Sequence, residues 1–109
     1  MRCPVQTHPV DVFRAIADPT RRELLALVAE GERPVRQLAS TFAMSRPAVS
    51  QHLRILLDAG LVTERKVGRE RYYRLNADPL REISLWVRQY EEFWRERLDA
   101  LGRHLEHSP

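Results

Sequence analysis

Apolar positions recur at intervals of three and four residues along most of the chain, and this period predicts amphipathic helices. We expect four helices in the first half of the chain, over residues 9–17, 19–30, 35–42 and 46–59. Asp18 before Pro19 and Ser45 before Arg46 suit helix starts, because a short polar side chain can cap the first N–H groups. Gly31 follows the second helix, as is typical of a helix end.

Only residues 43–45 separate the third helix from the fourth, and so short a connection is typical of a helix-turn-helix. A plain helical hairpin would show a similar pattern. The pattern over residues 61–67 and 70–75 then predicts two short strands joined by a turn at Gly68-Arg69. Tyr73 and Leu75 share one face of the second strand and should close the core. The expected fold is mainly α with a small β-hairpin wing, a winged helix-turn-helix in the order α-α-α-α-β-β-α.

A long final helix is expected over residues 79–106, with Asp78 as its N-cap and Pro79 in its first turn. Its apolar side chains have a spacing close to that of a heptad repeat: Leu80, Ile83, Val87, Tyr90, Trp94, Leu98, Leu101 and Leu105. A small core can cover only part of this stripe, so we expect the rest to pair with the same helix of a second copy. A helix lying flat across its own domain is the alternative.

The composition fits a soluble chain of one domain, with 109 residues, 43% hydrophobic and 30% charged. We divide it into an arm over residues 1–8, a winged helix-turn-helix over 9–78, a dimerisation helix over 79–106 and a tail over 107–109. No apolar run approaches the roughly 20 residues of a membrane span, and no signal peptide is expected. The single cysteine cannot form an internal disulfide, and a cytoplasmic location is the expectation.

Positive charge gathers in the expected hairpin. Residues 61–75 contain five basic and two acidic side chains, whereas residues 76–109 contain five basic and seven acidic ones. A basic middle beside an acidic end suggests that one side of the protein meets a polyanion. A merely solvated surface is the alternative.

The outward face of the fourth helix carries side chains suited to DNA: Arg46, Pro47, Ser50, Gln51 and Arg54. The second helix of a helix-turn-helix enters the major groove, where arginine can pair with guanine and glutamine with adenine. We therefore assign Arg46 and Gln51 to bases, Ser50 to a base or phosphate, and Pro47 to a thymine methyl group. Arg54, one turn further along, is expected at a phosphate. An ordinary exposed helix face would contain similar residues.

The hairpin should add a second set of contacts. Arg69 at its tip can enter a narrow minor groove, while Lys66 and Arg71 neutralise phosphates. His52 lies beside this recognition surface, and we expect it to be a packed residue bonded to a neighbour. With no carboxylate expected where it could orient His52, and no glycine-rich phosphate loop, the chain is not expected to be an enzyme.

With these residues the chain resembles the ArsR/SmtB family of bacterial winged helix-turn-helix repressors over residues 10–97. The matching strings are ADPTRR at residues 17–22, SRPAVSQHL at 45–53, and GR at 68–69 with YYRL at 72–75. The resemblance implies a homodimer that binds a double-stranded DNA operator and is released by an inducer. It also implies an interface through the first and last helices. From the apolar spacing we expect these interface residues: Phe13, Leu80, Ile83, Val87, Tyr90, Trp94, Leu98 and Leu101.

The chain departs from the metal-sensing members that it resembles. Those members often carry Cys-x-Cys in the third helix, whereas residues 34–38 here contain no cysteine, and residues 77–90 contain no histidine. His104 and His107 have helical spacing but lie near the chain end, and Cys3 stands alone in the arm. We therefore expect no metal site and no cofactor, and the residues indicate no particular inducer.

Three function classes follow. A sequence-specific transcriptional repressor is the favoured one, acting on a palindromic operator. A metal- or redox-responsive sensor of the same fold would retain stoichiometric metal or respond through Cys3. A winged-helix module for protein contacts would show no preference among DNA duplexes.

Overall fold

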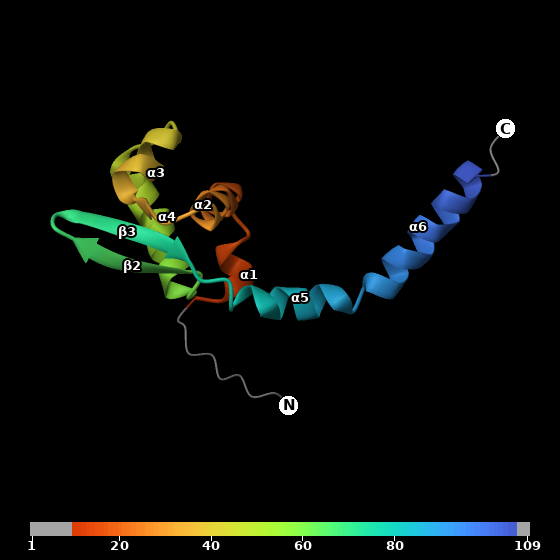
Figure 1. Ribbon diagram of the computed structural model, residues 1–109. Helices are drawn as coiled ribbons and strands as arrows, with labels where there is room; N and C mark the ends of the chain where they lie inside the picture. The colour runs from red at the N-terminus through yellow and green to blue at the C-terminus, as the bar shows by residue number, and fades with distance from the viewer. Residues whose placement is uncertain (1–9, 107–109) are drawn as a thin grey trace, which may run out of the picture.

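The computed structural model describes residues 10–106, and side chains through residue 102. Its helices are α1 (Val12–Ala15), α2 (Pro19–Ala29), α3 (Val35–Thr41), α4 (Arg46–Asp58), α5 (Leu80–Arg88) and α6 (Glu91–Glu106). Its strands are β1 (Arg33–Pro34), β2 (Val62–Val67) and β3 (Glu70–Leu75). The first four helices and the sheet form one body, α5 runs along its edge, and α6 extends away from it (Figure 1). The predicted winged helix-turn-helix is confirmed.

The core lies where α2, α3, α4 and the sheet meet. Leu24, Leu38, Leu53 and Leu56 are fully buried there, and Tyr73 of β3 closes it at 5% exposure. The apolar stripes predicted for these helices are therefore those that pack inward. The spacing in α2 predicted Leu24, Leu27 and Val28 as the inward face, whereas the helix buries Leu25 and leaves Leu27 only partly buried.

Two of the three predicted caps, Asp18 and Ser45, are present at the helices that frame the core. Ser45 Oγ accepts a hydrogen bond from the Ala48 N–H at 3.2 Å, and Asp18 Oδ2 accepts one from the Arg21 N–H at 3.0 Å. This backbone hydrogen bond and the nearby Arg21 charge hold the pKa of the Asp18 carboxyl below its usual range. Both caps satisfy N–H groups that a helix start leaves unpaired, and they fix where α2 and α4 begin.

The hairpin has the predicted two-residue turn. β2 pairs antiparallel with β3, with Val67 opposite Glu70, and Gly68 between them adopts a φ of +64° that favours glycine. A third strand, β1, was not predicted and lies on the other edge of β3, giving the order β1-β3-β2. Two paired residues are too few to show an alternating pattern, so β1 leaves no signal in the sequence.

Two predicted helix starts are wrong. The first helix begins at Val12, because Asp11 Oδ1 caps the Phe13 N–H at 3.3 Å, and not at residue 9. The start at Asp78-Pro79 is also wrong, since α5 begins at Leu80 with no side-chain cap. Residues 77–82 form i to i+3 backbone bonds instead, such as the one from the Leu80 N–H to the Ala77 carbonyl at 2.9 Å.

The single long helix predicted for residues 79–106 is wrong as well, because it is interrupted at Gln89 and Tyr90. Their N–H groups bond to the Trp86 and Val87 carbonyls three residues back, at 3.2 and 2.9 Å. This tighter turn ends α5, and α6 then starts in a new direction (Figure 1). The apolar stripe is therefore divided between two helices. No helix among residues 10–106 combines the length and apolar character needed to cross a membrane.

Candidate nucleic-acid interface

The helix-turn-helix consists of α3 and α4, and α4 presents its polar face outward. Val49 and Leu53 are fully buried, whereas the side chains on the opposite face are exposed: Arg46, Pro47, Ser50, Gln51 and Arg54. We call these five residues the recognition face. The Ser45 cap and Pro47 in the first turn place Arg46 at the start of the helix. The structure thus gathers the residues that a major-groove contact would require on one face.

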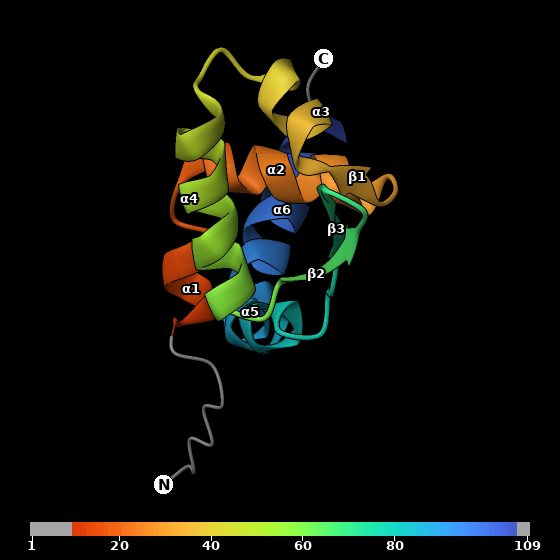
Figure 2. The same ribbon diagram turned by 90° about the vertical axis from the view of Figure 1, so that its left-hand side faces the viewer.

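The β2-β3 hairpin lies on the same side of the molecule as α4. Figure 2 looks at this side and shows α4 and the hairpin flanking the front of the body, with α6 behind them. Lys66, Arg69 and Arg71 are exposed on the hairpin. The two basic elements can therefore approach one duplex together.

Several of the basic side chains have acidic partners in the structure. Arg54 Nε lies 3.6 Å from Asp58 on the same helix, and Arg71 Nη1 lies 3.2 Å from Glu64 on the neighbouring strand. Within the described part of the chain, no carboxylate lies within 4.0 Å of Lys66. Exposed pairs of this kind are weak and can be exchanged for a phosphate.

Arg65 differs from these residues because Glu32 holds it with two hydrogen bonds. Its Nε and Nη2 donate at 2.6 and 2.9 Å, and the pKa of Glu32 is lowered by these bonds. Its guanidinium also lies over the Tyr72 ring, 5.7 Å from the ring centre. We therefore assign Arg65 to joining the strand to the body, and not to DNA.

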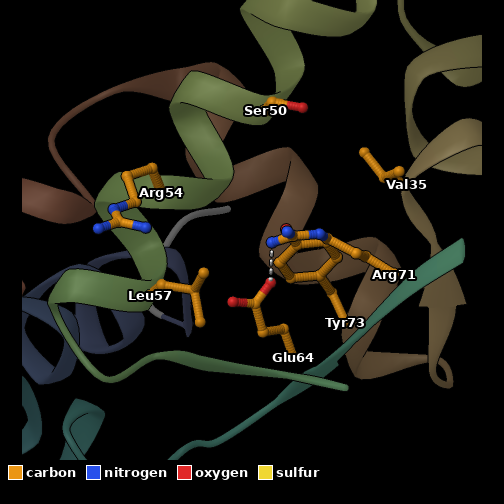
Figure 3. A pocket seen from close by; sticks show the side chains of 7 residues that line it. All are labelled: Val35, Ser50, Arg54, Leu57, Glu64, Arg71 and Tyr73. Atoms are coloured by element: carbon orange, nitrogen blue, oxygen red, sulfur yellow. Dashed lines mark hydrogen bonds and ion pairs between the residues drawn. The ribbon is translucent and has the colours of Figure 1, made fainter. Parts of the chain in front are cut away.

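A hollow of about 320 Å³ separates α4 from the hairpin. Figure 3 shows the side chains that line it, which are Val35, Ser50, Arg54, Leu57, Glu64, Arg71 and Tyr73. Arg71 bonds to Glu64 across the Tyr73 ring, while Arg54 points away from this pair (Figure 3). Burial raises the pKa of the Tyr73 hydroxyl, and the Tyr73 ring forms a wall of the hollow.

His52 is a packed residue with a bonded neighbour, as predicted. Its Nδ1 lies 3.3 Å from Arg21 Nη1, and Arg21 Nε donates to the Ala15 carbonyl at 2.7 Å. One carboxylate does come near the ring: Asp18 Oδ2 is 3.9 Å from His52 Nδ1, which is beyond hydrogen-bonding distance. Asp18 reaches it from the start of α2, which is distant in sequence. This cluster joins α2 to the inner side of α4, and Ser50 is exposed on the outer side.

Sequence reasoning did not identify Glu70 as part of this surface. Glu70 is the first residue of β3, and its side chain is 22% exposed. Its Oε1 accepts a hydrogen bond from Arg46 Nη2 at 3.2 Å, and its Oε2 accepts one from Arg36 Nε at 2.7 Å. A single glutamate in a basic hairpin carries no signal of these contacts, because both partners come from other elements.

The second distinctive surface is apolar and lies on α5 and α6. Phe13 of α1 contacts Trp86 edge to face at 5.7 Å, and Trp86 contacts Tyr90 in the same way at 5.6 Å. Of the predicted interface residues, Leu80 and Ile83 pack against the core and Val87 is half-buried. The large apolar side chains that remain exposed on these helices and at the turn between them are Leu85, Trp86, Tyr90, Phe93, Trp94, Leu98 and Leu101.

No group of three or more histidine, cysteine, aspartate or glutamate side chains suited to a metal ion occurs among the described residues. Residues 34–38, where a Cys-x-Cys was considered, span the end of β1 and the start of α3. Cys3 and His107 lie outside the described residues, and the His104 side chain does as well.

Comparison with known proteins identifies relatives over most of the chain. Residues 18–64 match the profile of the bacterial regulatory protein, arsR family. The transcriptional repressor SdpR of Bacillus subtilis (strain 168) is 38% identical over 77 residues, covering 71% of this chain and 86% of SdpR. The arsenical resistance operon repressor of Escherichia coli (strain K12) is 34% identical over 102 residues, covering 89% of this chain and 84% of that repressor.

The solved structures that this chain resembles are also those of transcriptional regulators. The crystal structure of a possible transcriptional regulator for arsenical resistance has 46% sequence identity and a TM-score of 0.68, over 86% of this chain and 95% of that one. An ArsR-like transcriptional regulator from Rhodococcus sp. RHA1 has 32% identity and a TM-score of 0.68, over 91% of each chain.

These relatives are regulators of transcription and not enzymes, in agreement with the expectation from the sequence. They share with this chain the helix-turn-helix and the wing, the elements that such proteins apply to DNA. The chain therefore belongs to the ArsR/SmtB family of winged-helix regulators and is a DNA-binding transcriptional repressor.

Proposed function

We propose that the protein acts as a homodimer that binds an imperfectly palindromic operator. The observation that carries this proposal is the separation of two surfaces on one small chain. α4 and the hairpin lie at the front of the molecule and α6 lies behind them (Figure 2), while α5 and α6 carry large exposed apolar side chains. Pairing through the apolar surface would leave two recognition helices free to contact one duplex.

The recognition face would read bases in the major groove. A guanidinium can donate two parallel hydrogen bonds to guanine, and a carboxamide can donate to and accept from adenine, so Arg46 and Gln51 are assigned to bases. Both are exposed, at the first turns of α4, where a recognition helix approaches base edges. Ser50 would serve a base or phosphate, and Pro47 a thymine methyl group.

The remaining basic side chains would fix the position of the protein on the duplex. Arg54 and Arg71 line the hollow between α4 and the hairpin, and Lys66 is exposed on β2. All three would neutralise phosphates. Arg69 stands beside Gly68 at the hairpin tip, from which an extended guanidinium would reach the minor groove.

Selection of bound duplexes from a random pool tests this proposal. The expected consensus is an imperfect palindrome whose half-site centres lie about one helical turn apart, roughly 34–36 Å. Equal affinity for selected and scrambled duplexes at physiological salt would contradict sequence-specific binding. A consensus that contains only one half-site would contradict the homodimer on DNA while retaining the contacts of α4.

Replacing the residues assigned to phosphates should weaken binding to all duplexes by similar factors. Arg54→Ala and Lys66→Ala each remove one positive charge from the DNA surface, so each should reduce the slope of log K against log salt by about one unit. Arg95→Ala is the matched control, because it removes one positive charge from α6, away from the recognition face. Titrations of selected and scrambled duplexes at several salt concentrations measure the slopes. An unchanged slope in both variants would contradict the phosphate assignment.

A further inference from the structure

We propose that Glu70 is a specificity-determining residue, which orients Arg46 for its base contact and weakens binding to DNA of other sequences. This inference rests on the proposed contact between Arg46 and a base. Glu70 carries the same sign of charge as DNA and lies among the side chains that would touch the duplex.

The contacts of Glu70 join the wing to both helices of the helix-turn-helix. Its two carboxylate oxygens accept hydrogen bonds from different helices: Arg46 at the start of α4, at 3.2 Å, and Arg36 of α3, at 2.7 Å. Glu70 itself directly follows the turn of the wing. The Glu70 side chain is 22% exposed and the Arg46 side chain is 53% exposed, so the arginine is the more accessible member of the pair.

This arrangement leaves Arg46 able to bind DNA while it keeps its bond to Glu70. A guanidinium has five N–H donors, of which this pair uses one, and a bidentate contact with guanine requires two. The carboxylate can therefore restrict the Arg46 side chain to fewer orientations while the arginine meets the base. Restricting a long side chain before binding reduces the conformational entropy that operator binding costs.

On DNA of other sequences, the negative charge of Glu70 weakens binding. Binding to random DNA depends mainly on positive charge near phosphates, and a carboxylate beside two arginines reduces this charge. Where the correct base is present, the oriented Arg46 compensates for the reduction. A repulsive group combined with a directed contact raises the affinity for the operator relative to the affinity for DNA of random sequence. This ratio defines specificity.

Glu70→Gln separates these effects from stability. Exposed ion pairs contribute little to folding, so the midpoint of thermal unfolding should change little. Affinity for a scrambled duplex should rise, and its salt slope should steepen by up to about 0.9. We define the specificity ratio as the affinity for a duplex selected by the wild-type protein divided by the affinity for a scrambled duplex. This ratio should fall about three- to tenfold, which is less than the full discrimination that one bidentate contact can supply.

Two further variants distinguish charge from position. Glu70→Asp keeps the charge but shortens the side chain, so it should lower the ratio with little change in scrambled-duplex affinity. Glu64→Gln is the matched control, since Glu64 lies on the same hairpin and bonds to Arg71 at 3.2 Å. Glu64→Gln should strengthen binding to the selected and the scrambled duplex by similar factors, and so leave the ratio of the two affinities unchanged.

The double variant with Arg46→Ala decides whether Glu70 acts through Arg46. In that background, Glu70→Gln should no longer lower the ratio. An unchanged ratio in Glu70→Gln alone, a ratio that rises, or a further fall in the double variant would overturn the inference. If Arg46→Ala relaxes one base position while Glu70→Gln relaxes none, only the role of Glu70 fails. If Arg46→Ala relaxes none, the base contact fails and the role of Glu70 fails with it.

Discussion

Replacing Trp94 and Leu98 together with glutamate should convert the proposed homodimer to a monomer. Both side chains lie on α6 and are 53% and 66% exposed in the single chain. Burying a large apolar side chain contributes about 1.5–3 kcal/mol, and a symmetric dimer would bury four of them. Their removal, with charge added at the interface, should raise the dissociation constant of the dimer more than about a thousandfold. Sedimentation velocity and light scattering measure the mass.

The same variant should lose most of its operator affinity. A monomer binds one half-site, whereas a dimer adds the second half-site at high effective concentration, which strengthens binding by about 10²- to 10⁴-fold. Glu96→Lys is the control: Glu96 is exposed and lies two positions from both Trp94 and Leu98, on the opposite side of α6. It should remain a dimer. An unchanged dimer mass in the double variant would place the interface elsewhere, for example at Phe13 and Trp86.

The elements predicted well from the sequence are those whose signal is local. Ser45, Pro47 and the spacing of Val49, Leu53 and Leu56 define α4, and the structure shows the same cap, start and buried face. The hairpin is also local, because Gly68 at a positive φ and the flanking strands specify its turn. Residues close together in the sequence determine both elements, so a single sequence is sufficient to predict them.

The features that were missed depend on contacts between distant residues or on small energy differences. Tyr90 continues the apolar spacing across the point where α5 ends, so periodicity alone predicted one helix. The i to i+3 bonds of Gln89 and Tyr90 change direction without glycine or proline, and no residue type marks such a turn. Asp18 beside His52, and β1 beside β3, depend on the packing of the whole domain.

The candidate site shows the same division. The recognition face could be assigned from the sequence because the buried positions of α4 determine which side chains point outward. Glu70 could not, since its partners Arg36 and Arg46 are 34 and 24 positions away and meet it only when the wing folds against α3 and α4. The cations of a DNA-binding surface are visible in composition, whereas the acidic groups that hold them are visible only in the structure.

Gln51→Ala and Arg46→Ala should each relax the base preference at one position per half-site. Removing a bidentate contact should cost about 1–3 kcal/mol on the selected duplex, which is about 5- to 150-fold in affinity, while a scrambled duplex should be affected much less. Gln37→Ala is the matched control for Gln51, since Gln37 is exposed on the neighbouring α3 and the variant removes the same carboxamide. Selection repeated with each variant, followed by titration of single-base changes, identifies the position. Arg46 and Gln51 should relax different positions, because they stand five residues apart on α4. If both variants keep the wild-type preference at every position, α4 does not read the bases in the assigned way, and discrimination must arise from the wing or from DNA shape.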